Sequence, residues 1–200
     1  KTITSRQNDL IKSVDNLKKA KVRKEQQQFV AEGLRTVQSL LAHYEPINIY
    51  LTQKAFDTHH FNISRDLIII VSDEVMQKIS SSKTPSGILC VFSIPSNKGK
   101  KLTPGLVLAN ITNPGNMGTL IRTAAAMNLK TVVIIDGTDV WSPKVIQSTA
   151  GTLACVNIFQ LSWDELIQQK RGLKLCALIV KDGLSPDKIN LQQSLIVVGN

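Results

Sequence analysis

The sequence predicts an α/β protein of two domains, in which a small mixed domain precedes a domain built on a parallel sheet. Its 200 residues suffice for two modest domains. Apolar runs alternate with helix-like segments through the second half, which is typical of a parallel sheet. Residues 95–104 are rich in Pro, Ser and Lys and have the composition of a linker. We therefore expect one domain at 1–94, a linker at 95–104 and a second domain at 105–200.

The first domain is predicted to combine helices with three short strands. Apolar residues recur at helical spacing through residues 5–41, and the lysine-rich stretch inside this segment is expected to bend it into two helices. A further helix is predicted at 72–80, where Ser72 is a candidate N-cap. The strands are predicted at 47–52, 67–72 and 87–94. This pattern indicates a small α/β or α+β unit.

The second domain is predicted to alternate strands with helices. Strands are expected at 105–111, 131–136, 155–160, 173–180 and 195–200, and helices at 116–128, 142–150 and 162–170. Such an alternation predicts a parallel sheet with helices on both faces. Ligands of these sheets bind outside the carboxyl ends of the strands. The loops NPGNMG, DGTDVWSP and VKDG all follow predicted strands, so we expect the site among them.

Composition excludes several classes of protein. No apolar run is long enough to span a membrane, and the polar N-terminus does not resemble a signal peptide, so we expect a cytoplasmic protein, although an organelle matrix also fits. Cys90, Cys155 and Cys176 are scattered, and each lies among apolar residues. We expect buried, reduced thiols rather than a disulfide framework, and no metal site.

The positive charge is concentrated near the N-terminus and in the linker. Of a formal net charge of +9, residues 1–35 contribute nine Lys or Arg against four Asp or Glu, and residues 94–101 add three lysines. Clustered positive charge attracts polyanions, most simply nucleic acid. A solvated helix face followed by a flexible linker explains the first 35 residues equally well.

The loop NPGNMGTLIR, residues 113–122, follows the first predicted strand of the second domain. It matches neither the P-loop nor the GxGxxG dinucleotide fingerprint. We expect Pro114 and Gly115 to form a tight turn, Asn116 to cap the helix, and Arg122 to lean back over Gly118. Helix N–H groups and a guanidinium then converge on a place that suits a phosphate. The alternative is a helix cap in which the Arg binds loop carbonyls.

These residues also carry a resemblance to a known family. NPGNMGTLIRTAAAMN and SPKVIQSTAGTL resemble the first conserved region of the SpoU/TrmH RNA ribose methyltransferases. These enzymes belong to the SPOUT class, whose methyltransferase domain contains a C-terminal trefoil knot. The N-terminal stretch, with EGLR at residues 32–35, resembles the substrate-binding domain that precedes it, which is similar to ribosomal protein L30e. LIVVGN at 195–200 resembles the start of the family's second motif.

The resemblance implies methyl transfer from S-adenosylmethionine to a ribose 2′-hydroxyl of structured RNA, with ribosomal RNA favoured over transfer RNA. It implies that Asn116 and Arg122 are catalytic and that Arg122 activates or orients the 2′-oxygen. It places the cofactor at Gly199, Asn200, Ala177 and Leu178, and the RNA at Lys12, Arg23, Lys24, Arg35 and Gly118. A homodimer is implied, without metal or membrane.

Two departures from the family pattern bear on these expectations. Gln147 stands where many relatives have a basic residue, which weakens a phosphate-binding role for its loop. The sequence ends where the second motif begins, so we expect the methyltransferase domain to be incomplete at its C-terminus. Three alternatives stay open: a non-catalytic RNA-binding or ribosome-assembly factor, a base-methylating SPOUT enzyme, and a nucleotide-binding α/β protein.

Overall fold

The computed structural model describes residues 1–199, and its contacts divide the chain into two compact units. The N-terminal unit comprises Lys1–Pro95 together with Trp141–Ala154. The C-terminal unit comprises Ser96–Val140 and the residues from Cys155 onward. Trp141–Ala154 lies inside the range predicted for the second domain, but its contacts group it with the first 95 residues.

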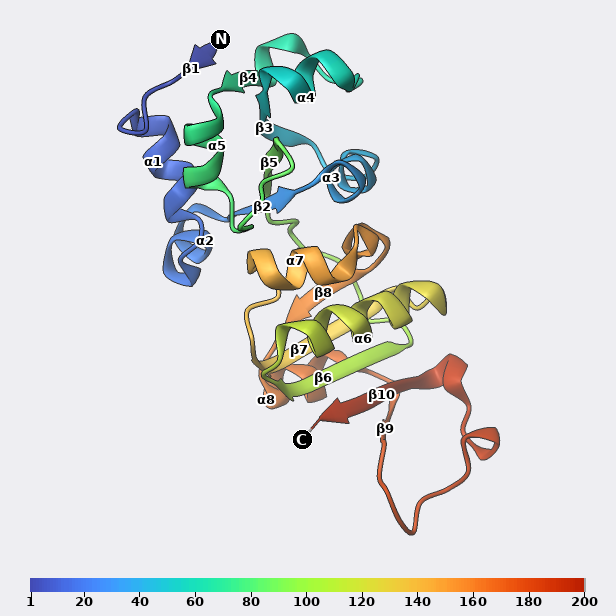
Figure 1. Ribbon diagram of the computed structural model, residues 1–200. Helices are drawn as coiled ribbons and strands as arrows, with labels where there is room; N and C mark the ends of the chain where they lie inside the picture. Colours follow the sequence, from blue (N-terminus) through green and yellow to red (C-terminus); the bar gives the residue numbers. More distant parts are fainter. Residues whose placement is uncertain (200) are drawn as a thin grey trace. The chain divides into compact units, whose positions relative to one another are not determined.

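A five-stranded mixed sheet forms the N-terminal unit, in the order β1-β4-β3-β5-β2 (Figure 1). The strands β1, β4 and β3 are parallel, whereas β5 runs antiparallel to both β3 and β2. Their bounds are β1 (Thr2–Ile3), β2 (Gln28–Glu32), β3 (Pro46–Thr52), β4 (Ile68–Val71) and β5 (Ile88–Ser93). The three strands predicted in this half are confirmed as β3, β4 and β5.

The helix predicted through residues 28–32 is wrong, because these residues form β2. Helix α2 (Ala20–Gln26) stops at its C-cap Gln27, whose backbone is left-handed (φ 53°), and the chain then pairs with β5. Phe29 and Ala31 become fully buried in the sheet. Pairing and burial in the tertiary structure therefore override the helical spacing of the apolar residues. Helices α1 (Asp9–Asn16), α2 (Ala20–Gln26) and α3 (Leu34–Leu41) account for the rest of the segment.

Two more helices complete the fold of residues 1–95. They are α4 (Gln53–Thr58) and α5 (Asp73–Ile79). The Ser72 side chain accepts a hydrogen bond from the Val75 N–H, which confirms Ser72 as the N-cap of α5. Ile11 and Val14 from α1 pack with Val75 and Met76 from α5 in one buried cluster. This cluster joins α1 and α5 to the same core.

The segment Trp141–Ala154 packs into the N-terminal unit through α7 (Pro143–Thr149). The Trp141 ring lies 5.0 Å from the Phe29 ring between centroids, and Phe29 stacks on Phe92 at 5.5 Å. Trp141 is 4% exposed. These aromatic rings come from segments that are distant in sequence, and they bury a large apolar area in one cluster.

The C-terminal unit contains a five-stranded sheet in the order β8-β7-β6-β10-β9, and every neighbouring pair is parallel. Its strands are β6 (Gly105–Ile111), β7 (Thr131–Gly137), β8 (Asn157–Gln160), β9 (Lys174–Ala177) and β10 (Ser194–Gly199). The predicted parallel sheet is confirmed. From β6 the chain moves first through β7 to β8, and then reaches β9 and β10 on the other side of β6. The strand order therefore reverses between β6 and β10.

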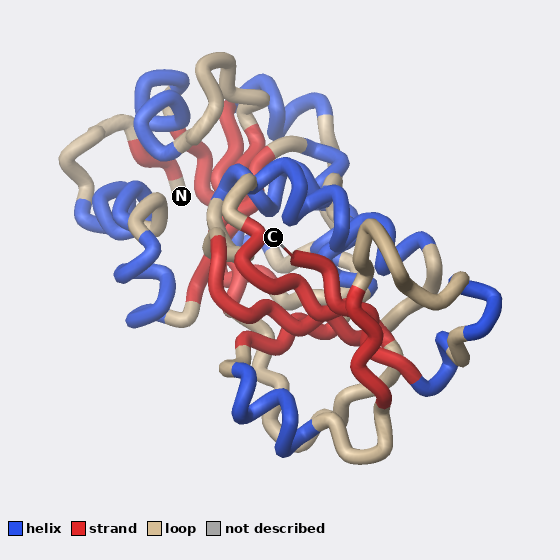
Figure 2. The backbone as a smooth tube through the Cα atoms, turned by 90° about the horizontal axis from the view of Figure 1, so that it is seen from below, coloured by secondary structure: helices blue, strands red, loops and turns tan. Residues whose placement is uncertain are grey.

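Helices lie on both faces of this sheet, as predicted (Figure 2). Helix α6 (Pro114–Ala126) packs on β6 and β7. Helix α8 (Trp163–Gln169) contributes Leu166 to a core cluster with Val107, Val133 and Phe159. Among the helices in the described part of the chain, none has the length and apolar character that crossing a bilayer requires.

Candidate active site and RNA-binding side chains

The candidate active site lies at the carboxyl edge of the second sheet, where β6 and β10 are neighbours. In open parallel sheets, the crevice at such a reversal of strand order is the usual ligand site. Gly199 at the end of β10 pairs with Ala109 on β6. The loop that leads from β6 into α6 leaves from the same edge. The structure thus brings together the strand end and the loop that the sequence nominated separately.

The backbone is distorted at this edge on two neighbouring strands. Asn110 on β6 and Asp136 on β7 both have left-handed φ angles, 55° and 56°. Gly137 has φ 98°, and a Cβ atom there would lie 2.6 Å from the Ile111 carbonyl oxygen. Asn, Asp and Gly tolerate this conformation better than other residues do. Residues in such conformations concentrate at functional sites.

Helix α6 begins earlier than predicted, and its cap is a different residue. Asn113 is the N-cap, and its side-chain oxygen accepts hydrogen bonds from the Gly115 and Asn116 N–H groups at 2.8 and 3.1 Å. Pro114 is the first helical residue, a position where its missing N–H costs nothing. The predicted turn at Pro114 and Gly115 and the predicted cap at Asn116 are therefore wrong. Two N–H groups expected to face an anion bind Asn113 instead.

The two predicted catalytic residues lie on the exposed face of α6. Asn116 is in the first turn, and Arg122 follows about two turns later. Thr119 lies between them on this face. Gly118 belongs to the opposite, buried stripe with Met117 and Ile121. Gly118 therefore fits helix packing on the sheet, and its burial argues against the predicted contact with RNA.

Arg122 is exposed and forms no hydrogen bond or ion pair with any residue from 1 to 199. Helical side chains lean toward the helix N-terminus, so the guanidinium reaches back toward the carboxyl edge of the sheet. A surface guanidinium with all its donors available is suited to bind a phosphate or a developing oxyanion. The structure does not show Arg122 bound to loop carbonyls.

The residues predicted to hold the cofactor lie on adjacent strands at the same edge. Ala177 ends β9 and pairs with Val197 of β10, and the Leu178 N–H donates to the Val197 carbonyl at 3.0 Å. A Cβ atom on Gly199 would lie 2.7 Å from the Ala109 carbonyl oxygen. The close approach of β6 thus already requires glycine there, before any cofactor is considered. Asn200 lies outside the described residues.

This edge has features that fit an adenosine. Ala177 and Gly199 carry small or no side chains at the strand ends, and Leu178 and Ile179 are apolar side chains that are 65% and 62% exposed. An apolar face with nearby backbone groups is the usual environment of a small-molecule cofactor. The chemistry of the residues present is therefore compatible with S-adenosylmethionine.

Most side chains predicted to contact RNA are exposed on helices of the N-terminal unit. Lys12 lies on α1, Lys24 on α2 and Arg35 in the first turn of α3. Arg23, in contrast, is only 3% exposed, and its Nη1 donates to the Leu17 carbonyl at 2.6 Å. This burial argues against the predicted phosphate contact. Arg23 instead binds the carbonyl of Leu17, the C-cap of α1.

The thiols do not all behave as predicted. Cys90 is buried, and burial raises the pKa of its thiol far above the ordinary value. Cys155 is exposed and Cys176 is half-buried, so the expectation of three buried thiols is wrong for these two. Within residues 1–199, no three His, Cys, Asp or Glu side chains come close enough to bind a metal ion together.

Sequence reasoning missed Asn113, Asn110 and Asp136. A signal for Asn113 was present, because Asn followed by Pro is a common start of a helix. The left-handed angles of Asn110 and Asp136 had no comparable signal, since many Asn and Asp residues adopt ordinary conformations.

Comparison with known proteins finds relatives for both parts of the chain. Residues 8–90 match the MRM3-like substrate binding domain, and residues 104–200 match the SpoU rRNA Methylase family. The chain is 30% identical to an uncharacterized tRNA/rRNA methyltransferase of Synechocystis, slr1673, covering 98% of this chain and 77% of the relative. It is 25% identical to the 23S rRNA (guanosine(2553)-2'-O)-methyltransferase RlmP of Bacillus subtilis, over 100% of this chain and 82% of RlmP.

A solved structure shows the same fold. The AdoMet-bound rRNA methyltransferase from Sinorhizobium meliloti superimposes with a TM-score of 0.82 at 22% identity, covering 100% of this chain and 80% of that protein. The order of the two matched domains agrees with the order of the two predicted domains. The chain therefore belongs to the SpoU rRNA methylase family.

Proposed function

We propose that this chain transfers a methyl group from S-adenosylmethionine to a ribose 2′-hydroxyl of ribosomal RNA. The observation that carries the proposal is the match of a substrate-binding domain followed by a SpoU methylase domain along one chain. Ribosomal RNA is favoured over transfer RNA because RlmP is named for 23S rRNA. The 2′-hydroxyl distinguishes RNA from DNA as a substrate.

In this proposal, the side chains of α6 bind the target nucleotide. S-adenosylmethionine supplies, when bound, a methyl group that its sulfonium has already activated. A guanidinium offers N–H donors and no acceptor, so Arg122 is better suited to donate hydrogen bonds than to remove a proton. Arg122 therefore holds the target phosphate and stabilises negative charge that develops on the 2′-oxygen. Asn116 orients the nucleotide beside it.

The cofactor and RNA are assigned to separate surfaces. Ala177, Leu178 and Gly199 would hold the adenosine of S-adenosylmethionine at the carboxyl edge of the second sheet. Lys12, Lys24 and Arg35 of the N-terminal unit would bind phosphates, which contributes affinity with little sequence information. We also propose the predicted domain boundaries, a knotted methyltransferase domain, a homodimer and a cytoplasmic location.

The test is methyl transfer to a defined RNA. The protein is incubated with methyl-labelled S-adenosylmethionine and a 23S rRNA transcript, and the RNA is digested to nucleosides for mass spectrometry. The proposal expects a labelled 2′-O-methyl nucleoside. A methylated base would assign the chain to a base-methylating branch. RNA binding without any labelled product would favour the non-catalytic alternative.

A further inference from the structure

Glu32, at the end of β2, is linked to a loop that is distant in sequence. Its Oε1 accepts a hydrogen bond from the Ser80 hydroxyl at 2.5 Å, and its Oε2 accepts one from the Ser81 N–H at 3.2 Å. Ser80 is only 6% exposed. Glu32 forms no ion pair with any residue from 1 to 199. Its carboxylate is therefore satisfied by this loop rather than by a cation.

The loop of residues 80–87, named here the serine loop, is held by hydrogen bonds at both ends and in its first half. The Ser82 N–H donates to the Ser80 hydroxyl at 2.9 Å, and the Thr84 N–H donates to the Ser82 hydroxyl at 3.2 Å. At its far end, the Thr52 N–H donates to the Gly87 carbonyl at 3.0 Å. Glu32 thus fixes the first turn, and β3 fixes the last residue. Such turns position the side chains that lie between them.

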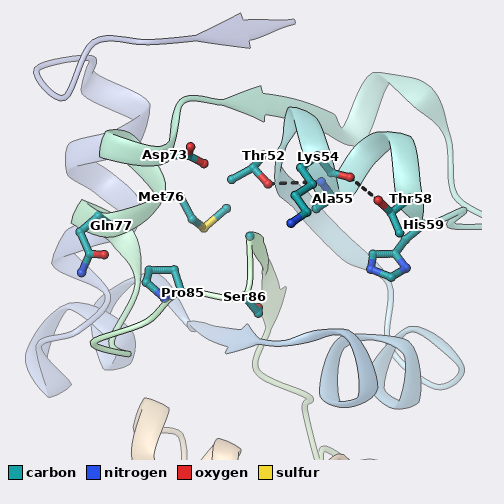
Figure 3. Close-up of a pocket in the computed structure, with 11 residues that line it drawn as sticks. Thr52, Lys54, Ala55, Thr58, His59, Asp73, Met76, Gln77, Pro85 and Ser86 are labelled. Atoms are coloured by element: carbon teal, nitrogen blue, oxygen red, sulfur yellow. Dashed lines mark hydrogen bonds between the residues drawn. The ribbon is translucent and has the colours of Figure 1, made fainter.

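The serine loop forms one wall of a cavity of about 400 Å³ in the N-terminal unit. Pro85, Ser86 and Gly87 line this cavity from the loop, and Lys54 lines it from α4 (Figure 3). Met76 contributes an apolar part of the lining. Lys83, in the middle of the loop, is exposed. The lining of the cavity is of mixed charge, because Asp73 contributes a carboxylate as well as Lys54 a cation, and the exposed Lys83 adds a second cation on the loop.

The cations of the N-terminal unit differ in whether a carboxylate lies beside them. Lys12, Lys18 and Lys21 of the N-terminal run lie 3.1, 2.8 and 3.8 Å from carboxylates of Asp or Glu in their own segment. Lys54, Lys83 and Arg35 form no such ion pair within the described part of the chain. Exposed ion pairs weaken the attraction of a cation for a polyanion only modestly. Cations without a carboxylate neighbour can nevertheless bind a phosphate without first breaking an ion pair.

We propose that the serine loop is an RNA-binding surface and that Glu32 is the residue that positions it. This inference rests on the proposed function, since RNA is the partner it names. Glu32 itself does not touch the RNA. The Glu32 carboxylate repels a nearby phosphate backbone. We therefore expect the affinity gained by holding Lys83 and the cavity wall in place to exceed the affinity lost through this repulsion.

The sign of the change in affinity separates positioning from simple electrostatics. If charge alone mattered, Glu32→Ala would tighten RNA binding because it removes a negative charge. Positioning predicts the opposite: binding of a 23S rRNA transcript weakens by about tenfold, the order expected from losing charge-assisted hydrogen bonds. Glu32→Gln keeps an acceptor for the Ser80 hydroxyl, so its affinity should lie between those of the wild type and Glu32→Ala. Fluorescence anisotropy measures all three.

The matched control is Glu45→Ala. Glu45 is an exposed carboxylate of the same unit, two positions before Ile47 of β3, and forms no ion pair within residues 1–199. Its removal changes the charge as Glu32→Ala does, without releasing the serine loop. We expect Glu45→Ala to bind RNA as tightly as the wild type or slightly more tightly. Circular dichroism melting checks that every variant is folded.

A double-mutant cycle tests whether Glu32 acts through the loop. Lys83→Ala should lower affinity and reduce the salt slope of binding by about one ion. In the Glu32→Ala background, Lys83→Ala should have little further effect. Folded Glu32→Ala protein that binds RNA as tightly as wild type, or effects that simply multiply, would overturn the proposal. These measurements need no methyl transfer, so failure of the proposed enzymatic activity would remain distinguishable.

Discussion

At the residue scale, Arg122 is the side chain whose replacement best tests the active site. It is exposed on α6 and binds no other side chain among residues 1–199. Arg122→Ala should therefore leave the fold intact but abolish methyl transfer, because the charge on the reacting oxygen loses its stabilisation. RNA affinity should change by a small factor only, since one phosphate contact among several is lost. Single-turnover assays and anisotropy measure the two effects.

Two variants sharpen this prediction. Arg122→Lys keeps the charge but loses the planar fork of donors, and it should recover only part of the activity. Thr123→Ala changes the next residue, whose hydroxyl binds the Thr119 carbonyl within the helix, and it should be fully active. Full activity of Arg122→Ala would exclude the assigned role.

At the element scale, the start of α6 decides where its side chains lie. Asn113→Ala removes the acceptor for the Gly115 and Asn116 N–H groups, and loss of such a cap costs about 1 kcal/mol. We expect lower stability in urea unfolding together with lower methyl-transfer activity, because Asn116 loses its fixed position. Ser162→Ala removes the equivalent cap of α8 and should cost similar stability with activity unchanged. Equal activity losses in both variants would point to stability alone.

The cap of α8 also predicts a dependence of stability on pH. Glu165 accepts a hydrogen bond from the Ser162 N–H at 2.7 Å, and this bond lowers the pKa of the carboxyl below its ordinary value of 4.5. The contribution is therefore present above the ordinary pKa and is lost as the pH falls through the lowered one. The stability difference between wild type and Glu165→Gln should shrink in acid. Urea unfolding at neutral pH and well below pH 4.5 measures it, and a constant difference would contradict the assignment.

The elements differ in how well the sequence predicts them, for physical reasons. The parallel strands of the C-terminal unit are continuous apolar runs separated by helices. Few structures other than a buried parallel strand fit a run of this kind. Phe29 and Val30 continue a helical spacing, which predicts a helix through residues 28–32, whereas their strand partner, β5, lies some sixty residues away. Non-local pairing of this kind leaves no mark in a local pattern. The family resemblance predicts that the site includes residues of α6 and β10, but it does not predict the cap at Asn113.

At the scale of the whole molecule, the chain leaves the second sheet after β7, packs a segment in the N-terminal unit and returns as β8. Trp141 is the largest apolar side chain of that segment, and it is buried against Phe29. Alternation of strands and helices along the sequence assigns α7 to the second sheet, because the pattern records order and not contact. The core of residues 1–95 therefore includes side chains from a segment that lies almost fifty residues further along the chain.

This dependence leads to a prediction for Trp141→Ala. Removing a buried Trp costs about 3–5 kcal/mol, and the loss should appear in the N-terminal unit. Hydrogen exchange should accelerate in β2 and β5, which contain Phe29 and Phe92, before it accelerates in β6 and β7. Trp163→Ala is the matched control, because Trp163 is 43% exposed at the start of α8 and its loss should leave β2 and β5 protected. Faster exchange confined to β6 and β7 in Trp141→Ala would instead assign the segment to the second sheet.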